Sequence, residues 1–349
     1  MSKKRVCVLG HFGNGLELLN GQTVKTKIVT EELCLKFGEN EILKIDTHGG
    51  AKTLIKAPLQ VIKALKTSKN VVIFPAHNGL RVYAPMLSFF KKFFSGTKLH
   101  YAVIGGWLPE FIEKRKSLSK HLQKFDGIYV ETKTMKKALE EQGFDNISIV
   151  PNCKRLNILR EDELIYDNRP PFHLCTFSRV MKEKGIEDAI NAVKAVNEKR
   201  GQAVYTLDIY GQIDSNQTEW FEKLKSEFPD YISYKGCVDP TKSVEVLKEY
   251  FALLFPTYYQ GEGFAGTVID AFSAGVPVVA SDWKYNAEIV SDGKNGFIFE
   301  THNVQKLADI LQKAIENPDI FNSLKTNCLY CAHRYEPEKA LEALFDNIN

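Results

Sequence analysis

The chain has 349 residues, which predicts about two domains, because one hydrophobic core rarely grows beyond about 300 residues. Hydrophobic residues make up 44% of the sequence and charged residues 26%, so wholesale disorder and low-complexity or collagen-like architectures are excluded. The net charge of +3 is too small to indicate a nucleic-acid-binding protein.

The charge is unevenly distributed along the chain. Residues 1–150 contain 24 Lys and Arg against 13 Asp and Glu, a net charge of +11, whereas the remainder carries −8. This asymmetry indicates that the first half faces an anionic partner. No apolar run approaches the roughly 18 to 20 residues that span a bilayer, and the basic start lacks the apolar segment of a signal peptide. We therefore expect a cytoplasmic protein.

Seven scattered cysteines, an odd number without an export signal, favour a reducing compartment. Cys328 and Cys331 form a Cys-x-x-Cys pair, but no second pair or nearby His pair completes a tetrahedral zinc site. We expect both cysteines on a late helix.

Short apolar runs rich in β-forming residues alternate with helical patterns, which predicts parallel α/β sheets. In chain order these predicted strands are 5–9, 41–45, 71–74, 99–104, 127–130, 147–150, 172–177, 205–210, 231–234, 252–255, 277–280 and 297–299. The alternation stops in a polar, charged stretch at 156–171 that ends in Arg-Pro-Pro and is typical of a linker. The sequence thus predicts two Rossmann-like domains in tandem.

The expected domain boundaries follow from this pattern. They are an N-terminal domain at 1–156, a linker at 157–171, a C-terminal domain at 172–332 and a C-terminal helix at 333–349. The pattern leaves open whether this last helix packs back on the N-terminal domain. In open parallel sheets, ligands bind beyond the carboxyl ends of the strands, where helix N-termini present backbone N–H groups to anions. The strand-to-helix junctions are therefore the places to look for chemistry.

Two junctions of the second domain carry suitable side chains. Arg179 presents a planar fork for phosphate oxygens, and Lys184 adds a point charge at the start of the next helix, so together they would hold a diphosphate. Glu262 precedes a glycine-rich turn, and Asp270 follows eight residues later, about two helical turns on. Either basic residue alone can belong to a solvated basic turn. Taken alone, the acidic pair is more typical of a helix N-terminal carboxylate and an ordinary helix acid.

Four motifs occur in order along this half. They are Arg-x4-Lys-Gly at 179–185, Glu-Gly-Phe at 262–264 with an acid at 270, Ala-Gly-x-Pro-Val-Val-Ala at 274–280, and Glu-Ile-Val-x-Asp-Gly-x-Asn-Gly at 288–296. Together with Val-Pro-Asn at 150–152, this series resembles the retaining glycosyltransferases of family 4. The resemblance is strong over about residues 150–330 and weak before them. It implies the α/β GT-B fold, in which two Rossmann-like domains face each other across a cleft.

The resemblance also implies roles for individual residues. Arg179 and Lys184 would neutralise the diphosphate of a nucleotide-sugar donor, Glu262 would contact its sugar, and Asp270 would bind the ribose hydroxyls. Further donor-binding positions are Phe264, Ala265 and Gly266 through their main chain, Gly236 to Val238 beside the nucleobase, and Gly21 in the Asn20-Gly21-Gln22 loop of the first domain.

Two positions depart from the family pattern. Asp270 stands where Glu is more usual and is one methylene shorter, which puts its reach to the ribose in question. The histidine that family members often carry after a first-domain strand is absent from the Ile104-Gly-Gly-Trp107 junction. His11 and His77 are the acceptor-side substitutes, although a lone histidine more often packs or forms hydrogen bonds.

We expect no metal cofactor, because no Asp-x-Asp pair is present to hold Mg²⁺ on a nucleotide diphosphate, and Arg179 with Lys184 would take its place. The predicted function is a metal-independent, retaining transfer of a hexose-type sugar from a nucleotide-diphosphate donor, with UDP favoured over GDP. The acceptor would be a glycan or a lipid-linked molecule in cell-envelope or capsular polysaccharide synthesis. The alternatives are a same-fold nucleotide-sugar epimerase or phosphorylase, or a non-catalytic glycosyltransferase-like subunit.

Residues 52–137 hold a net charge of +13, and two segments there combine lysines with apolar stripes. We expect helices over 86–98, with four phenylalanines, and over 111–125, with lysines at 116, 120 and 124. Both stripes can simply pack on the sheet. The alternative is peripheral docking on an anionic membrane, at the inner face of the plasma membrane.

Overall fold

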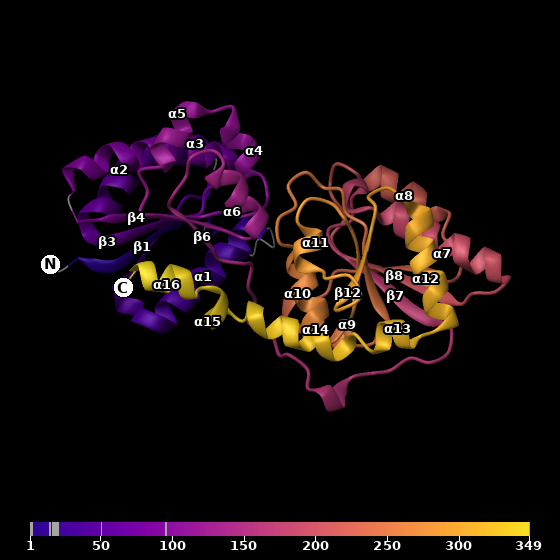
Figure 1. The fold of residues 1–349 in the computed structure, drawn as a ribbon. Helices are drawn as coiled ribbons and strands as arrows, with labels where there is room; N and C mark the ends of the chain where they lie inside the picture. Colours follow the sequence, from indigo (N-terminus) through magenta and orange to yellow (C-terminus); the bar gives the residue numbers. More distant parts are fainter. Residues whose placement is uncertain (1–2, 14, 16–20, 50, 95, 349) are drawn as a thin grey trace. The chain divides into compact units, whose positions relative to one another are not determined.

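The computed structural model describes residues 3–13, 15, 21–49, 51–94 and 96–348. The chain divides into two compact units, each built on a parallel sheet (Figure 1). Unit 1 comprises Met1–Cys153 and Pro337–Asn349, and unit 2 comprises Lys154–Glu336. The predicted α/β class is therefore confirmed.

Unit 1 contains a six-stranded parallel sheet with the order β2-β1-β3-β4-β5-β6. Its strands are β1 (Lys4–Gly10), β2 (Ile42–Asp46), β3 (Ser68–Ile73), β4 (Lys98–Ala102), β5 (Gly127–Val130) and β6 (Ile147–Ile149). The central strands are buried on both faces, which explains their nearly continuous apolar runs, such as Val6 to Leu9. Its main helices are α1 (Gly21–Phe37), α2 (Ala51–Thr67), α3 (His77–Phe90), α4 (Leu108–Glu113), α5 (Lys116–Leu122) and α6 (Lys133–Glu140).

Unit 2 repeats this architecture with the strand order β12-β11-β10-β7-β8-β9. Its strands are β7 (Phe172–Phe177), β8 (Tyr205–Tyr210), β9 (Ile232–Gly236), β10 (Ala252–Phe255), β11 (Val278–Ser281) and β12 (Gly296–Phe299). Its helices are α7 (Ile186–Arg200), α8 (Thr218–Ser226), α9 (Ser243–Leu247), α10 (Gly266–Ser273), α11 (Asn286–Ile289), α12 (Val304–Glu316), α13 (Asp319–Asn322) and α14 (Lys325–Ala332). All twelve predicted strands are present, with ends shifted by up to three residues.

The segment expected as a linker, 157–171, is part of unit 2 and packs on the rest of it. Leu159 is 3% exposed, and its backbone N–H donates to the carbonyl oxygen of Ser273 over 2.9 Å. Leu164 lies against Gly275, where a Cβ atom would come within 2.1 Å of its side chain. Although 157–171 is mostly polar, apolar residues such as Leu159 and Leu164 pack against the rest of unit 2 and hold the segment on its surface. Cys328 and Cys331 lie on α14, as expected.

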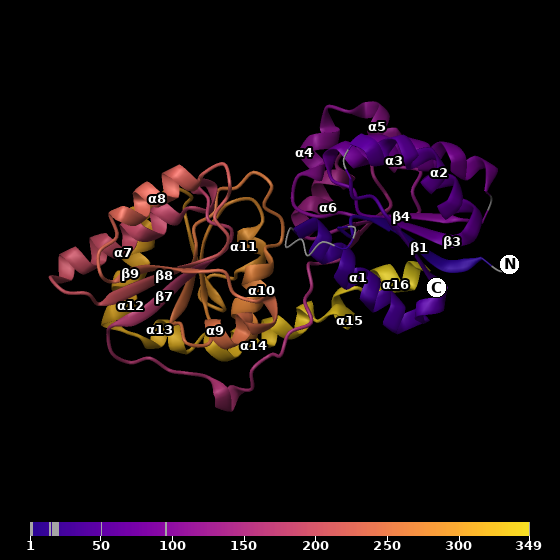
Figure 2. The same cartoon turned by 180° about the vertical axis from the view of Figure 1, so that it is seen from behind.

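The end of the chain forms α15 (Pro337–Ala340) and α16 (Glu342–Ile348), which Figures 1 and 2 show beside α1. Leu341, Leu344 and Phe345 are buried in one core cluster with Val29 and Leu33 of α1. The C-terminal segment therefore completes the hydrophobic core of unit 1.

The two apolar stripes of the basic region behave differently from each other. Leu118, Leu122 and Phe125 are at most 6% exposed, so the stripe over 111–125 is buried, and α5 lies against α3 and α4. Phe89 and Phe93 are 53% and 70% exposed at the end of α3 and the short 3-10 helix that follows it. Among the described residues, no helix is both long and apolar enough to cross a bilayer.

Candidate functional site

Two central strands of unit 2, β7 and β10, are neighbours, so the loops at their carboxyl ends meet. The N–H of Tyr258 donates to the carbonyl oxygen of Glu183 over 2.8 Å and joins the two loops. Gly185 has φ +71°, and a Cβ atom there would lie 2.1 Å from the carbonyl oxygen of Pro256. Only glycine allows this approach, which brings the preceding Lys184 beside the second loop.

Lys184 forms an ion pair with Glu262, with 2.6 Å between Nζ and Oε2. Their side chains are only 13% and 8% exposed, so each charge depends on the other for compensation. The hydroxyl of buried Thr257 donates to the same carboxylate oxygen over 2.7 Å. Both bonds end on Oε2, which leaves Oε1 as the oxygen that can accept from a ligand.

Further residues after β10 and at the end of β11 hold Thr257 in place. The Ser281 hydroxyl donates to the backbone oxygen of Thr257 over 2.6 Å, and Asn286 donates to the backbone oxygen of Ser281 over 3.1 Å. Trp283 donates its indole N–H to the backbone oxygen of Tyr259 over 2.8 Å, and the ring of Tyr259 lies 5.2 Å from the Lys184 ammonium. Sequence reasoning missed these supporting residues, because they follow β10 and β11 and meet only through the sheet.

Arg179 occupies a more open position after β7. Its side chain is 51% exposed, and its guanidinium lies 3.6 Å from the carboxylate of Asp214. Gly211, after β8, has φ +131° and would place a Cβ atom 1.8 Å from the Ser178 carbonyl oxygen. The loop that carries Arg179 is thus held against its neighbour, while the guanidinium stays accessible to an anion.

Helix α10 begins shortly after Glu262 in the chain and presents backbone N–H groups at its start. Ala265 is the N-cap and Gly266 the first helical residue, so the first N–H groups have no partner within the helix. Phe264 is 5% exposed and packs edge-on against Tyr335, with 4.6 Å between ring centres. The hydroxyl of Thr267 is buried and has no hydrogen-bond partner among the described residues.

Asp270 is 2% exposed and uses both carboxylate oxygens. Lys154 Nζ lies 2.5 Å from Oδ2, and the Ser243 hydroxyl donates to Oδ1 over 3.0 Å. The sequence revealed neither partner, because Lys154 lies 116 residues earlier in the chain. The carboxylate is therefore a buried, internally compensated group.

Gly236 and Val238 follow the last strand of the sheet. Gly236 has φ +77°, and its carbonyl oxygen accepts from the Gly211 N–H over 2.8 Å, while Val238 is half-buried. Asp239 next accepts hydrogen bonds from Thr241, which lower the pKa of its carboxyl. This turn lies on the same sheet edge as the Arg179 loop. The predicted donor-binding positions from Arg179 to Asp270 all belong to unit 2.

The first-domain positions lie in unit 1. Gly21 begins α1, and Asn20 lies outside the described residues. His11 follows β1, with its Nδ1 2.7 Å from the Thr23 hydroxyl and its Nε2 2.8 Å from Nδ1 of His48. Burial lowers the pKa of His11, and His48 lowers it further. The sequence analysis did not predict the contact between the imidazole rings of His11 and His48.

His77 is the first residue of α3 and lies in an aromatic group. Its ring stacks on Trp107 with 3.9 Å between centres, and Phe111 meets it edge-on at 4.9 Å. Burial lowers the pKa of His77, and nearby Arg115 adds to this effect. Within the described ranges, no three His, Cys, Asp or Glu side chains gather as a metal-binding group.

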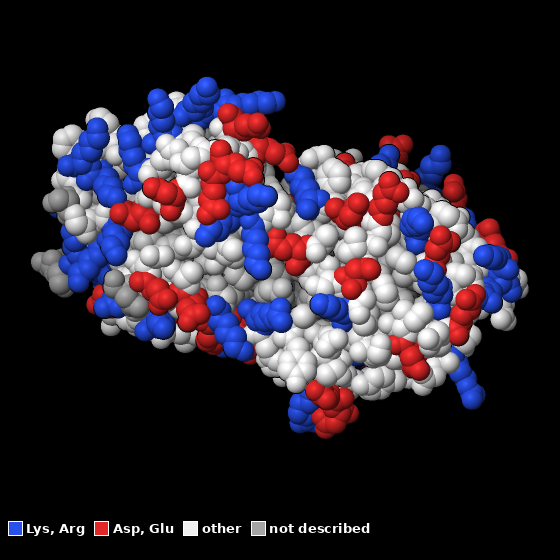
Figure 3. Space-filling model, viewed as in Figure 1, with Lys and Arg blue, Asp and Glu red and all other residues white. Residues whose placement is uncertain are grey.

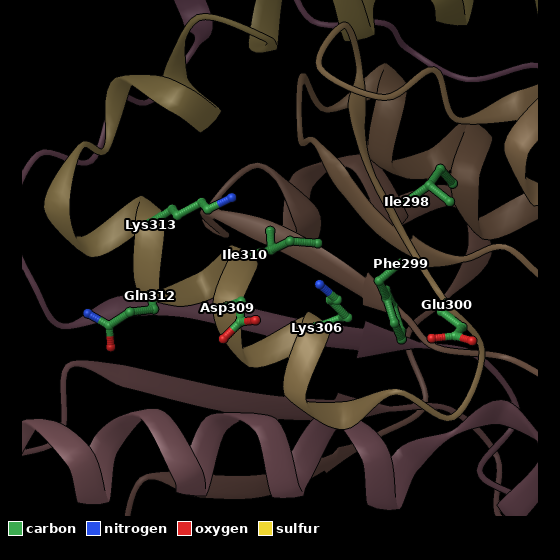
Figure 4. Close-up of a pocket in the computed structure, with 8 residues that line it drawn as sticks. All are labelled: Ile298, Phe299, Glu300, Lys306, Asp309, Ile310, Gln312 and Lys313. Atoms are coloured by element: carbon green, nitrogen blue, oxygen red, sulfur yellow. The ribbon is translucent and has the colours of Figure 1, made fainter.

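A cavity of about 410 Å³ lies between β12 and α12 (Figure 4). It is lined by Ile298, Phe299, Glu300, Lys306, Asp309, Ile310, Gln312 and Lys313. None of the predicted site residues lines it, and we assign it no role in the reaction.

A comparison with known protein families matches a segment that covers most of unit 2 and reaches into the C-terminal segment of unit 1. The family model described as "Glycosyl transferases group 1" matches residues 160–345, just over half of the chain. A UDP-N-acetylglucosamine–peptide N-acetylglucosaminyltransferase GtfA subunit of Streptococcus gordonii is 29% identical over 181 residues, which are 50% of this chain and 34% of that protein. A poly(glycerol-phosphate) alpha-glucosyltransferase of Bacillus subtilis is 28% identical over 171 residues, 47% of this chain and 24% of that protein. The chain thus spans about a third or less of the length of these relatives.

Solved structures resemble the fold over more of the chain. HepE of Anabaena, solved with UDP and glucose, has a TM-score of 0.73 at 14% identity and covers 99% of both chains. TarM of S. aureus, in a complex that contains UDP, has a TM-score of 0.66 at 20% identity and covers 85% of this chain and 59% of its own. At these identities the likeness shows the fold, which is the expected GT-B fold.

The two cationic side chains should differ in their effect on folding. Lys184→Met leaves the Glu262 carboxylate buried without its counter-charge and should lower the free energy of unfolding by about 3 kcal/mol. Arg179→Met removes a half-exposed charge and should change it by less than about 0.5 kcal/mol. Urea denaturation of the two variants checks this contrast, and equal losses would show that the ion pair contributes no more than a surface charge.

Proposed function

Because the chain belongs to the group 1 glycosyltransferases, we propose that it transfers a hexose-type sugar from a UDP-sugar with retention of anomeric configuration. The observation that carries this proposal is the buried Lys184–Glu262 pair, which joins a cation and a carboxylate at the carboxyl ends of β7 and β10. The relatives named for UDP-N-acetylglucosamine transfer, and the HepE complex with UDP and glucose, support this donor class. The family 4 motifs support retention.

The chemical step requires stabilisation of the diphosphate that leaves. Arg179 and Lys184 supply positive charge to its oxygens, and the first N–H groups of α10 add hydrogen-bond donors. Oε1 of Glu262 accepts from a sugar hydroxyl while Oε2 stays bound to Lys184 and Thr257. The acceptor oxygen bonds to the anomeric carbon on the same face that the diphosphate leaves. The bond between the anomeric carbon and the phosphate oxygen breaks, and the acceptor proton passes to that departing oxygen.

The same two cations are the reason to propose a reaction that does not depend on a metal ion. A divalent cation neutralises a nucleotide diphosphate in many transferases, and Asp or Glu side chains must then hold it. Here the side chains at this position are a guanidinium and an ammonium, which carry the compensating charge themselves.

For the acceptor, we propose a glycan or a lipid-linked molecule of the cell envelope or capsule. Relatives named as a poly(glycerol-phosphate) alpha-glucosyltransferase and a poly(ribitol-phosphate) alpha-N-acetylglucosaminyltransferase support a cell-envelope polymer. Unit 1, with His11 and His77 after its strands, is the proposed acceptor side.

Donor binding should survive chelation and depend on Arg179. In EDTA, UDP should bind the wild-type chain, and a UDP-hexose should still be turned over, because the cations belong to the protein. Arg179→Met should weaken UDP binding by tenfold or more, since a charge-assisted hydrogen bond contributes about 1.5 to 3 kcal/mol. Calorimetry and a UDP-release assay make these measurements.

Lys223→Met, a change on the exposed face of α8, is the matched control and should bind UDP like the wild type. Unchanged UDP affinity in Arg179→Met would remove this residue from the donor site. Turnover that disappears in EDTA and returns with Mg²⁺ or Mn²⁺ would contradict the metal-independent mechanism.

Glu262 is assigned to the sugar, so its effect should differ from that of Arg179. Glu262→Gln keeps the shape of the side chain but removes the charge that pairs with Lys184. We expect turnover of the UDP-sugar to fall at least tenfold more than the affinity for UDP itself, because UDP lacks the sugar. Losses of equal size in turnover and in UDP affinity would place Glu262 at the nucleotide instead.

We also propose that unit 1 docks on an anionic membrane. Phe89 and Phe93 are exposed, and Ile55 and Leu59 on the neighbouring helix α2 are 81% and 73% exposed. Figure 3 shows Lys and Arg side chains gathered along the upper edge of unit 1, over α3 and α5. Exposed apolar side chains with surrounding lysines are the pattern of a peripheral membrane protein.

Vesicle binding tests the membrane proposal. The chain should co-sediment with vesicles rich in anionic lipid at low salt and dissociate as salt screens the attraction. The triple change of Lys116, Lys120 and Lys124 to Glu should abolish binding, while changing three exposed lysines of unit 2 (Lys199, Lys223 and Lys225) to Glu should not. A wild-type chain that stays in the supernatant at low salt would rule out this docking.

A further inference from the structure

An aromatic cluster lies in unit 1 after the adjacent parallel strands β3 and β4, at the carboxyl edge of the sheet. The ring of His77 stacks on Trp107, and Phe111 of α4 lies edge-on to both rings. The Trp107 indole N–H donates to the carbonyl oxygen of Ile104 over 2.8 Å, which fixes the ring beneath the exposed His77. Fixed aromatic rings of this kind suit the apolar face of a sugar or a polyol.

Arg115, in the turn between α4 and α5, adds a positive charge to this cluster. Its guanidinium carbon lies 3.9 Å from the centre of the Phe111 ring, and Nη1 donates to the Phe111 carbonyl oxygen over 2.7 Å. Both contacts orient the side chain, and neither neutralises it. In the part of the chain that the structure describes, Arg115 forms no ion pair. Neither the motifs nor the mechanism above uses this arginine.

An exposed guanidinium that is oriented but unpaired is prepared for an anion. The bond to Phe111 uses one of the five N–H groups of Arg115, so the planar fork can still bind two oxygens of a phosphate. Ordering a long side chain opposes binding, and the contacts with Phe111 have already ordered this one. Burial lowers the pKa of His77 and the Arg115 charge lowers it further, so the field of the guanidinium reaches the aromatic cluster.

The basic surface continues past this arginine into a groove of about 320 Å³. Lys116 and Lys120 line the groove, together with one acid, Glu113, and the two amides of Gln123 and Gln142. Ammonium groups suit phosphate oxygens, whereas amide and carboxylate oxygens accept from hydroxyl groups. This combination of donors and acceptors matches a ligand that carries both phosphates and hydroxyls.

We propose that Arg115 is a specificity-determining residue that binds a phosphate of the acceptor, while the polyol or sugar of that acceptor lies over His77, Trp107 and Phe111. The acceptor is thus a phosphorylated polyol or glycan. This inference rests on the proposed function, because it presumes that unit 1 binds the acceptor of a sugar transfer. A polyol-phosphate chain and a lipid-linked glycan phosphate are two sources of the same phosphate chemistry.

The measurement is the phosphate preference, defined as kcat/KM for a phosphorylated acceptor divided by kcat/KM for its uncharged counterpart, with a UDP-hexose as donor. One arm compares a soluble glycerol-phosphate oligomer with an uncharged glycerol oligomer. The other compares a sugar linked through phosphate to a short-chain lipid with the alkyl glycoside of the same sugar. The wild type should show a preference of about tenfold or more in the arm that contains the true source, since hydrogen bonds between charged groups have this strength.

Variants of the arginine test its role. Arg115→Met should reduce the phosphate preference towards one, and Arg115→Lys should restore only part of it, because an ammonium lacks the planar fork. Lys114→Met removes the exposed charge next in the chain and is the matched control that should keep the preference. A purely structural role for Arg115 would lower the turnover of both acceptors together, which leaves their ratio unchanged.

The outcomes separate this inference from the proposed function. A wild-type preference near one in both arms, or one that persists in Arg115→Met, would overturn the role of Arg115 while UDP binding still supports the donor assignment. If the wild type binds UDP but turns over none of the four acceptors, calorimetry in the presence of UDP makes the same comparisons, and equal affinities for charged and uncharged acceptors would overturn the inference. Failure of the wild type to bind UDP would overturn the proposed function, and this inference with it.

Discussion

The ion pair between Lys184 and Glu262 is the interaction on which the geometry of the proposed donor site depends. It ties the loop after β7 to the loop after β10, and both of its members are nearly buried. A buried charge is tolerated only with a close partner and further hydrogen bonds, which Thr257 provides here. The pair can exist only because Gly185 lets the two loops approach, so a backbone constraint and an electrostatic one support each other.

Buried lysine–carboxylate ion pairs also occur elsewhere at the edges of both sheets. In unit 1, Lys25 of α1 pairs with Glu131 just after β5 over 2.5 Å, and its ammonium also donates to the Val103 carbonyl oxygen over 3.1 Å. In unit 2, Lys154 pairs with Asp270. Each pair joins segments far apart in the chain and places a compensated charge near the carboxyl ends of strands, where the ligands of parallel sheets bind. Such pairs add little net stability compared with apolar contacts, but they hold polar side chains in defined positions.

The basic half of the chain shows why composition alone does not identify a surface. The apolar stripe over 111–125 and the phenylalanines near residue 90 have similar periodicity and similar flanking lysines. The first stripe is buried at Leu118, Leu122 and Phe125, and α5 lies against α3 and α4. Phe89 and Phe93 stay exposed, at the end of α3 and in the short 3-10 helix that follows it. Lys92 near the phenylalanines, and Lys116, Lys120 and Lys124 in the other stripe, are exposed, so both places are compatible with an anionic partner.

By itself, the sequence determined the twelve strands, the two units and the order of the site motifs. Buried parallel strands are short continuous apolar runs, and the residues that follow them must lie at one sheet edge, so Arg179, Lys184 and Glu262 could be placed from local pattern alone. Only the tertiary structure decided the partners of these side chains. Thr257, Ser281, Ser243 and Lys154 carry no motif, and they reach the site through strand order and helix packing, which bring together residues up to 116 positions apart. The burial of Asp270 was likewise decided by packing, because a single carboxylate in a helix looks the same in sequence whether it faces solvent or a lysine.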